Sequence, residues 1–392
     1  MGAVYDMSYE ILNRLMDSWQ DLREIVVYGF GKVAQRNIDK IARDFSVKCI
    51  VDNDPRYVDG GSYQGIAIQN MQRAKEDLKT HKVIVCTSSL AYASIQKDLQ
   101  SLGLKEFEDY CRLEDFMPEW YWKNRREVVI SQMSSSITSR CTLNCQHCNV
   151  FMPYYKEHYD TTVEEIMRDM ELLFERVDYL TSYFVFGGEP LLNKNLPEML
   201  TEIYDKYHDR IGYMQIITNG TVMPSSELLE ACKACKVKIR LSDYTRQVPY
   251  DKKLAEVKET LDKSGVDWSM GVYDTWLSLE FPAVKKSIAN NPEDAKRHML
   301  ACSQGCHMVG DGRLYYCGAL CNAQRCGLWQ VREGDYVDLQ KSEGSLEQDK
   351  LRVLRYCLGD VDQKYISLCN VCWGAGADNP HEVTAGVQME RR

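Results

Sequence analysis

Three cysteines with short, regular spacing are the residues of this sequence best suited to chemistry. Cys141, Cys145 and Cys148 form a C-x3-C-x2-C pattern. Such a triplet can supply three thiolates to a cluster of four irons and four sulfides, [4Fe–4S], and it leaves the fourth iron open to another molecule. Zinc is the alternative, but structural zinc normally takes four ligands, and His147 lies too close to Cys148 to be a comfortable fourth. Three buried thiols without a metal would be unusual, because free cysteines rarely crowd in this way.

Three polar segments follow downstream, each directly after a β-rich apolar run: Gly187-Gly188-Glu189-Pro190, Thr218-Asn219-Gly220 and Ser242-Asp243. Together with the cysteine triplet, they resemble the signature of the radical S-adenosylmethionine (radical SAM) enzymes. In that family the GGEP-like segment serves the amino group of bound SAM, and the later strand ends contact its ribose and carboxylate. The resemblance therefore implies a SAM-binding [4Fe–4S] cluster on the three cysteines. It also implies SAM contacts from Gly187, Gly188, Glu189, Asn219, Ser242 and Asp243.

The elements that must position these motifs alternate between strand and helix. Periodicity predicts a strand at 128–138, followed by helix–strand pairs. The helix comes first in each pair: 162–177 and 180–186, 196–207 and 213–218, 225–232 and 236–241, and 251–264 and 267–272. This is the pattern of a βα barrel, in which active sites gather at the C-terminal ends of the strands. Cys141, Gly187, Asn219 and Ser242 all fall at such ends. Strands chosen for their apolar pattern alone thus place every motif on one rim.

A second cysteine pattern occupies the last third of the chain. Cys302 is followed after nine residues by Gly312 and after four more by Cys317, and Cys369 and Cys372 form a later C-x2-C pair. This resembles the twitch subdomain, a shortened relative of the SPASM domain, in which four cysteines hold one auxiliary [4Fe–4S] cluster. Gly312 would lie in a hairpin turn that brings two cysteines together.

The other cysteines leave alternatives open. Four lie close enough in sequence to substitute as ligands or to bind a second auxiliary cluster: Cys306, Cys321, Cys326 and Cys357. A four-cysteine zinc site is the competing interpretation of the same spacing. Cys232 and Cys235 form a C-x2-C outside a thioredoxin context, so we expect ordinary buried thiols there. Cys49 and Cys86 fall within predicted strands and are expected in the core.

Residues 1–110 read as a separate α/β domain. A strand at 24–28 runs into a glycine turn with the pattern G-x-G-x-x-A, from Gly29 to Ala34, and a second strand ends at Asp52. This matches the mononucleotide-binding half of a Rossmann-like fold, in which the glycines let the backbone approach a phosphate. The segment also resembles small Rossmann-like domains of surface-polysaccharide and nucleotide-sugar pathways. The alternative is that the glycines only make the turn and the domain docks a partner or a neighbouring domain.

The predicted fold class is therefore α/β. A Rossmann-like domain (1–110) and a connector (111–127) precede a partial (β/α)6 radical SAM barrel (128–295), and a small cysteine-rich twitch subdomain (296–392) follows. The connector carries large aromatic residues, which we expect to pack at an interface.

Composition bounds the function. The chain has 392 residues and a net charge of −9, with no long basic run, which argues against a general nucleic-acid binder. No secretory signal and no apolar run of about 18 residues is found, so we expect no membrane span and reduced thiols in the cytoplasm.

The resemblance implies a radical SAM oxidoreductase: SAM is cleaved reductively, and the 5′-deoxyadenosyl radical removes hydrogen from the substrate. An auxiliary cluster would accept the substrate's second electron. Because twitch-bearing relatives include a dehydrogenase of an aminocyclitol alcohol, we expect oxidation or epimerisation of a sugar, aminocyclitol or nucleotide-sugar substrate, with a flavodoxin or ferredoxin-type reductant. The general base is open among His158, Arg240, Asp243, Tyr244 and Asp274. The alternatives are side-chain modification of a peptide or protein, and a non-catalytic iron–sulfur protein that binds SAM.

Overall fold

The computed structural model describes residues 14–57, 60–87, 89–283, 286–302, 307–342, 344–376 and 378–390. The chain divides into two compact units, Met1–Ser131 and Gln132–Arg392. Segment 111–127, expected as a connector, lies in the first unit together with residues 128–131, whereas residues 132–295 and segment 296–392 share one sheet in the second. The four-part division of the chain stays a prediction.

The first unit is built on one six-stranded sheet. Its strands are β1 (Glu24–Tyr28), β2 (Ser46–Val51), β3 (Gly61–Tyr63), β4 (Ile66–Gln69), β5 (Lys82–Val85) and β6 (Tyr110–Arg112), in the order β3-β4-β2-β1-β5-β6. All neighbours are parallel except β3 and β4. The helices are α2 (Lys32–Asp44), α3 (Lys75–Thr80), α4 (Ser89–Ser101) and α5 (Leu113–Arg125). A central parallel strand buried on both faces explains why β1 reads as a continuous apolar run.

The core of this unit contains two of the cysteines assigned to it from sequence. Cys49 lies in β2 among buried apolar side chains, and Cys86 directly follows β5 with no exposed surface. In α5, the aromatic rings of Trp120, Tyr121 and Trp122 are buried. Trp120 and Tyr121 pack within the unit, as their contacts with Phe45 show.

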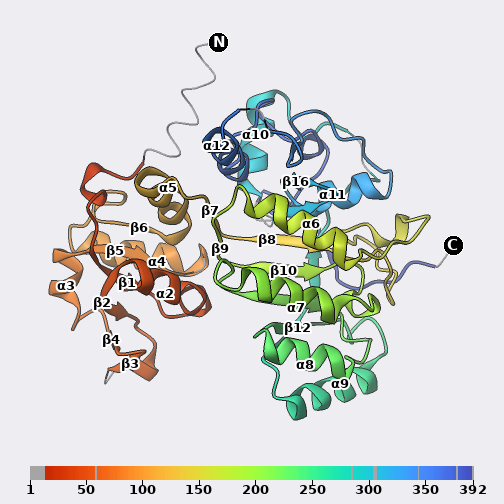
Figure 1. The fold of residues 1–392 in the computed structure, drawn as a ribbon, viewed down its shortest axis with the longest axis horizontal. Helices are drawn as coiled ribbons and strands as arrows, with labels where there is room; N and C mark the ends of the chain where they lie inside the picture. Colours follow the sequence, from red (N-terminus) through yellow and green to blue (C-terminus); the bar gives the residue numbers. More distant parts are fainter. Residues whose placement is uncertain are drawn as a thin grey trace. The chain divides into compact units, whose positions relative to one another are not determined.

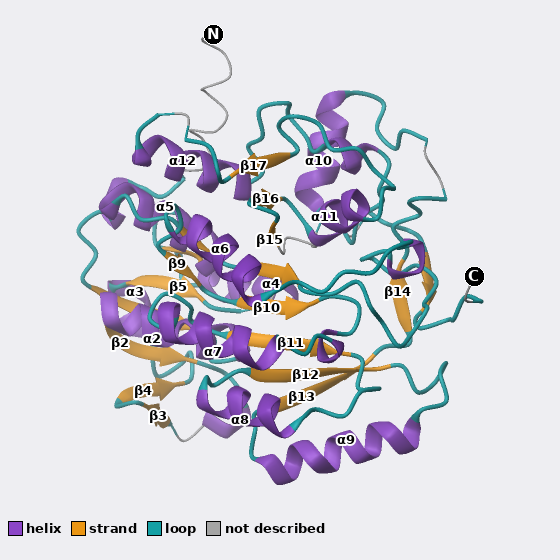
Figure 2. Ribbon diagram, turned by 45° about the vertical axis from the view of Figure 1, so that its right-hand side comes forward, coloured by secondary structure: helices purple, strands orange, loops and turns teal. Residues whose placement is uncertain are grey.

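The second unit is built on an eight-stranded sheet (Figures 1 and 2). Its strands are β8 (Met133–Ser136), β10 (Tyr183–Phe186), β11 (Met214–Thr218), β12 (Lys238–Asp243), β13 (Trp268–Val272), β15 (His307–Gly310), β16 (Arg313–Tyr315) and β17 (Tyr336–Asp338). Their order is β13-β12-β11-β10-β8-β15-β16-β17. Helices α6 (Val163–Phe174), α7 (Leu196–Tyr207), α8 (Ser226–Ala234) and α9 (Asp251–Ser264) connect the parallel strands. Parallel strands joined by helices confirm the predicted α/β class.

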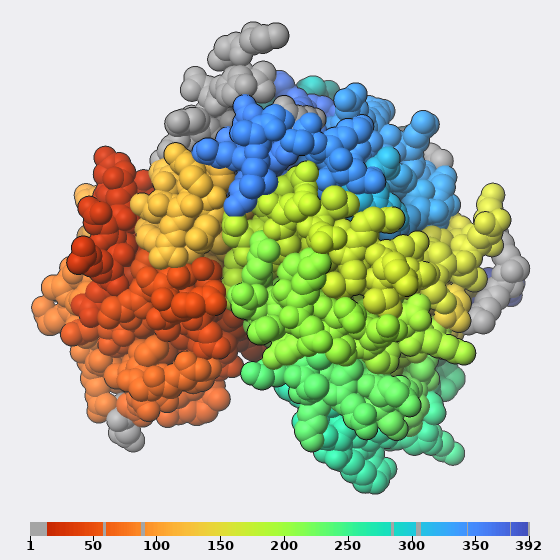
Figure 3. All heavy atoms as spheres, viewed as in Figure 1, coloured from red at the N-terminus to blue at the C-terminus, as the bar shows by residue number. Residues whose placement is uncertain are grey.

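The sixth parallel strand of this sheet comes from the C-terminal part of the chain. β15 pairs in parallel with β8, and the hairpin with β16 and β17 continues the sheet beyond it. The remaining helices of this part are α10 (Pro292–Ala301), α11 (Gly318–Arg325) and α12 (Leu346–Cys357). The space-filling view shows the blue C-terminal residues directly against yellow-green residues of the same unit (Figure 3). Lys350 Nζ also pairs with Asp178 at 2.7 Å.

The strand expected at 128–138 is two shorter strands, β7 (Val129–Ile130) and β8. The break falls at Ser131, where one unit ends and the next begins. A two-stranded sheet of β14 (Thr275–Leu277) and β18 (Glu382–Thr384) brings the C-terminal segment back to the barrel strands, and β9 (Tyr179–Leu180) precedes β10. Of the described residues, none belongs to a helix both long and apolar enough to cross a lipid bilayer.

The described residues also form short 3-10 helices at Asp17–Trp19, Pro55–Tyr57, Met152–Tyr154, Pro190–Leu192 and Ser367–Asn370.

Candidate functional site

The four sequence motifs lie at one edge of the parallel sheet. The loop with Cys141, Cys145 and Cys148 follows β8, the Gly-Gly-Glu-Pro segment follows β10, Asn219 follows β11, and Ser242 and Asp243 end β12. Because these strands are parallel, their C-terminal ends meet on the same side. The sheet therefore brings together residues that are more than a hundred positions apart in sequence.

Two glycines fix the approach between the first two motifs. A Cβ atom at Gly188 would lie 2.2 Å from the carbonyl oxygen of Arg140, and one at Gly187 would lie 2.5 Å from that of Thr138. The backbone N–H of Gly188 donates to Thr138 O, and that of Glu189 donates to Arg140 O, both at 2.8 Å. Only residues without a side chain allow this contact, so the glycine pair positions the chain immediately before Cys141.

The carboxylate of Glu189 links the second motif to the third. Its Oε1 accepts hydrogen bonds from Thr218 Oγ1 at 2.6 Å and from Leu191 N at 3.2 Å, and its Oε2 accepts one from Asn219 N at 2.8 Å. The side chain has no exposed surface. Burial raises the pKa of Glu189 to about 7, although these donors oppose the shift. Glu189 thus orients the end of β11.

Asn219 reaches from β11 to the cysteine loop. Its Nδ2 lies 3.7 Å from Cys141 Sγ and donates to Thr142 Oγ1 at 3.1 Å, while its Oδ1 accepts from Thr221 N at 2.9 Å. The three thiols influence one another: burial chiefly raises the pKa of Cys141 to about 12, and the nearby Cys145 and Cys148 add to the rise. A metal ion would have to deprotonate these thiols to bind them.

The fourth motif is held by a residue that sequence reasoning missed. Tyr250 OH donates to Asn219 O at 3.0 Å and lies 3.4 Å from Ser242 O, so the phenol joins the ends of β11 and β12. Tyr244 N in turn donates to Tyr250 OH at 2.9 Å. Asp243 Oδ1 accepts from Thr245 N at 2.8 Å. No sequence pattern marks Tyr250, because its role depends on the turn that precedes α9.

The structure separates the five candidates for a general base. Asp274 is exposed and pairs with Arg246, and Arg240 donates to Tyr273 OH. His158 Nδ1 lies 3.1 Å from Ser139 O. Asp243 lies at the end of β12, where it forms the turn already described. Burial is the largest cause of the raised pKa of Tyr244, and the thiols of Cys145 and Cys148 contribute to the rise. A raised pKa keeps this phenol protonated, which disfavours Tyr244 as a base.

The C-terminal segment also reaches the cysteine loop, a contact that sequence reasoning missed. Gln146 N donates to Val387 O and Met389 N donates to Asn144 O, both at 2.7 Å. This segment contains no cysteine and no recognised motif. No local signal in the sequence could have assigned it to the site.

The four cysteines of the second pattern line one cavity in the C-terminal part. Cys302, Cys317, Cys369 and Cys372 share this cavity with His298, Tyr316 and apolar side chains. Backbone N–H groups of Gly374 and Ala375 point at Cys372 Sγ and Cys302 Sγ, each at 3.4 Å. A cavity lined by four thiols and supplied with N–H donors suits a sulfur-ligated metal group.

The other cysteines differ in position. Cys321 and Cys326 lie at α11 and Cys357 ends α12, and none of the three belongs to the lining of the four-cysteine cavity. Cys306, the fourth predicted substitute, lies outside the described residues. Cys232 and Cys235 are buried, and burial raises the pKa of both thiols, as expected of unreactive cysteines. Among the side chains that the structure describes, no three or more of His, Cys, Asp and Glu converge on a point suited to a single metal ion.

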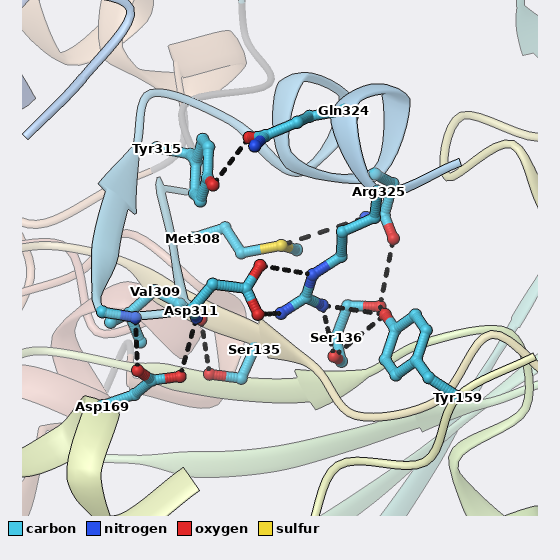
Figure 4. Close-up of polar contacts among 12 residues, drawn as sticks. Ser135, Ser136, Tyr159, Asp169, Met308, Val309, Asp311, Tyr315, Gln324 and Arg325 are labelled. Carbon is cyan, nitrogen blue, oxygen red and sulfur yellow. Dashed lines mark hydrogen bonds and ion pairs between the residues drawn. The ribbon is translucent and has the colours of Figure 1, made fainter. Parts of the chain in front are cut away.

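A polar network fixes the C-terminal hairpin to β8, the strand that leads to Cys141 (Figure 4). Asp169 on α6 accepts the backbone N–H groups of Asp311 and Gly312 at 3.1 and 2.7 Å. Arg325 on α11 pairs with Asp311 and donates to Ser136 O at 2.9 Å. The predicted hairpin turn at Gly312, with a φ of 69°, is therefore tied to the strand that precedes the cysteine loop.

The glycine turn of the first unit makes its own contacts. Gly29 has a φ of 95°, and a Cβ atom there would lie 2.9 Å from Cys86 O. The backbone N–H of Phe30 donates to Asp52 Oδ2 at 2.5 Å. A phosphate bound at this turn would need that N–H as a donor. Gly31 precedes α2 with open space beside it. The turn is thus formed as predicted, and the Asp52 carboxylate holds one of its backbone donors.

Comparisons with known proteins concern mainly the second unit. Residues 135–263 match the sequence model of the Radical SAM superfamily. A probable GTP 3′,8-cyclase of Methanococcus aeolicus is 31% identical over 106 residues, which are 26% of this chain and 33% of that protein. The chain thus spans about a third of the length of this curated relative.

Two solved structures are similar at low identity. One is native anSMEcpe with bound AdoMet and Kp18Cys peptide, with a TM-score of 0.37 and 15% identity over 63% of this chain and 93% of that one. The other is BtrN in complex with AdoMet and 2-DOIA, with a TM-score of 0.38 and 15% identity over 61% of this chain and 85% of that one.

Proposed function

We propose that this chain, which belongs to the Radical SAM superfamily by the match of its residues 135–263 to the family model, is an enzyme. It would cleave S-adenosylmethionine reductively and oxidise a carbohydrate-type substrate. The cofactors of the superfamily are a [4Fe–4S] cluster and SAM. The single observation that carries the proposal is the contact network around Glu189 and Asn219, which joins the Gly-Gly-Glu-Pro segment to the loop of Cys141.

The residues present fit this cofactor pair. Cys141, Cys145 and Cys148 would hold the cluster, since three thiolates from one loop leave one iron open. When bound, the cluster and SAM supply a 5′-deoxyadenosyl radical that removes a hydrogen atom from carbon. The protein's part is to orient: the glycine pair and Glu189 set the strand ends, and Asn219 and Asp243 present polar groups at the same rim.

The four-thiol cavity supports oxidation as the net reaction. Converting an alcohol to a carbonyl requires that the substrate lose one hydrogen atom, one proton and one electron. Cys302, Cys317, Cys369 and Cys372 would hold an auxiliary cluster, which would take up that electron. The base for the hydroxyl proton stays open among the candidates named above, and the raised pKa of the buried Tyr244 keeps its phenol protonated, which disfavours that residue as the base.

Two features support the substrate class: the resemblance of the subdomain order to twitch-bearing dehydrogenases, and the Rossmann-like unit in front. A sugar, aminocyclitol or nucleotide sugar fits both. Epimerisation of the same substrate would leave its mass unchanged, whereas oxidation would lower it by two hydrogens. A flavodoxin or ferredoxin-type protein would supply the electron, and a reducing cytoplasm would keep the thiols free.

Anaerobic turnover tests this function. Protein reconstituted with iron and sulfide is given dithionite, SAM and a panel of aminocyclitols and nucleotide sugars, and 5′-deoxyadenosine and oxidised sugar are measured by mass spectrometry. We expect both products, and we expect neither from the Cys141→Ala, Cys145→Ala, Cys148→Ala triple variant. Cys232→Ala, remote from both cysteine sets in sequence, is the matched control.

Each other outcome contradicts a defined part of the proposal. Undiminished SAM cleavage by the triple variant would overturn the whole. A modified peptide with no oxidised sugar would replace the substrate class by peptide side chains. No SAM cleavage under reducing conditions, with the cluster present, would indicate an iron–sulfur protein that binds SAM without turnover.

A further inference from the structure

The C-terminal segment 382–390 forms a strap that runs onto the cysteine loop. Its first residues form β18 and pair with β14, and Ala385 N then donates to Asp274 O at 2.9 Å. Gly386 follows with a φ of 76°, and a Cβ atom there would lie 3.1 Å from Tyr244 Cβ. A residue with a side chain is disfavoured at this φ, so glycine lets the strap pass closely over Tyr244.

Beyond Gly386 the strap pairs with the loop at the second cysteine of the motif. Cys145 and Gln388 form an antiparallel β-bridge. On its two sides, Gln146 N donates to Val387 O and Met389 N donates to Asn144 O. Asn144 Nδ2 adds contacts to the carbonyl oxygens of Met389 and Glu390 at 3.1 and 3.3 Å. The strap therefore holds the cysteine loop along its backbone.

The side chain of Gln388 contacts this loop with both ends of its amide. Oε1 accepts from Asn144 N at 2.7 Å, and Nε2 lies 3.1 Å from Cys145 Sγ and 2.7 Å from Gly386 O. The orientation of the amide follows from its partners. Turning it over would place an NH2 group against the N–H of Asn144 and an oxygen against the carbonyl of Gly386, so both contacts would be lost. The N–H of Gln388 is thus directed at the sulfur.

We propose that Gln388 is a positioning residue of the cluster site. Its side-chain amide holds the cysteine loop closed against the strap, and its N–H tunes the reduction potential of the cluster bound there. This inference rests on the proposed function, because it assigns a cluster to Cys141, Cys145 and Cys148. Reduction adds an electron to a cluster that is already bonded to thiolates. An N–H donor aimed at a ligating sulfur stabilises the added negative charge and so raises the potential.

Two variants distinguish the roles of the oxygen and the N–H of the Gln388 amide. Gln388→Glu keeps an oxygen for Asn144 N and replaces the donor near Cys145 Sγ by a carboxylate oxygen. Gln388→Leu removes both contacts at similar size. Glu382→Gln is the control, because this residue is exposed on the same strap and lies away from the cysteine loop in the β14–β18 pair.

The first measurement is a redox titration of the EPR signal that responds to added SAM, which identifies the cluster at this site and not an auxiliary one. We expect both Gln388 variants to be harder to reduce, Gln388→Leu by about tenfold in the reduction equilibrium, or ~59 mV for one electron. Glu382→Gln should match the parent. An unchanged potential in both Gln388 variants would overturn the tuning role.

The second measurement needs no cluster. Hydrogen–deuterium exchange of the cluster-free protein should show faster exchange at residues 144–146 in Gln388→Leu than in the parent, and near-parental exchange in Gln388→Glu, which keeps the acceptor for Asn144 N. Equal exchange in all three would overturn the closing role. If the parent binds no SAM-responsive cluster at all, the proposed function fails instead, so the two failures are distinguishable.

Discussion

The backbone N–H of Asn219 donates to the carboxylate of Glu189 at 2.8 Å, and the acceptor is completely buried. This bond connects the end of β10 to the end of β11, two strands whose motifs would serve the same cofactor. Thr218 Oγ1 donates to the other oxygen of the same carboxylate at 2.6 Å. One buried acid thus determines how a glycine-rich turn and an asparagine lie beside the cysteine loop.

Replacing Glu189 by alanine is expected to destabilise the second unit. Thr218 and Asn219 N would lose their acceptor inside the protein, and each buried donor left unpaired costs about 1–3 kcal/mol. We expect the cluster-free variant to lose about 2 kcal/mol or more in urea unfolding, and the reconstituted variant to bind SAM more weakly by calorimetry. Glu189→Gln keeps the size and one acceptor, so its losses should be smaller. Parental SAM affinity in Glu189→Ala would exclude an orienting role.

The same carboxyl group predicts a pH dependence of stability. In the unfolded chain a glutamate loses its proton near its ordinary pKa of 4.5, whereas in the folded protein Glu189 keeps it to about pH 7. Between these values the folded state binds more protons, so this contribution to stability is complete below pH 4.5 and decreases as the pH rises to 7.

The measurement is the free energy of unfolding of the cluster-free protein from pH 4.5 to 8, taken as the difference between the parent and Glu189→Gln. Other titrating groups cancel in this difference. We expect the parent to lose stability relative to the variant as the pH rises. A difference that is flat, or that rises with pH, would contradict the raised pKa.

Substituting Gly188 by alanine should impair the site through steric contact. The added methyl group would meet Arg140 O at 2.2 Å and Met152 Sδ at 2.8 Å, so the chain before Cys141 has to move. We expect SAM cleavage to fall at least tenfold and cluster content to drop. Gly265→Ala is the control: it follows α9 with a φ of 73° and little around it, so it should cost roughly 1 kcal/mol of stability and leave SAM cleavage intact. Equal effects of the two variants would show that only stability had changed.

The four-cysteine cavity predicts a metal content that depends on its lining residues. We expect Cys369→Ser to lower the iron of anaerobically purified protein by about four per chain, the content of one cluster. Cys321→Ser, buried elsewhere in the same unit, should leave iron unchanged. Iron and zinc are both measured by plasma mass spectrometry. Loss of one zinc per chain from Cys369→Ser would identify the competing zinc site, and loss of iron from Cys321→Ser would reassign the ligands.

Much of the fold could be read from local patterns. Helices α7 (Leu196–Tyr207) and α9 (Asp251–Ser264) have the predicted boundaries, because apolar residues recur on one face and turn residues flank both segments. Strand β1 also matches, as a continuous apolar run before a glycine turn. The chain thus determined by itself which residues form these elements and that the cysteine triplet follows a strand.

The tertiary structure decided what those elements contact. Ser134 and Ser135 in β8 are polar yet buried, because their hydroxyls donate to His307 O and Val309 O of a strand some 170 positions away. The sequence could not show that β15 would lie beside β8, or that Gln388 would reach Cys145. Hydrogen bonds between distant segments leave no periodicity along the chain. Spacing therefore predicted the candidate ligands, while the partners that orient them appeared only once the strands were packed together.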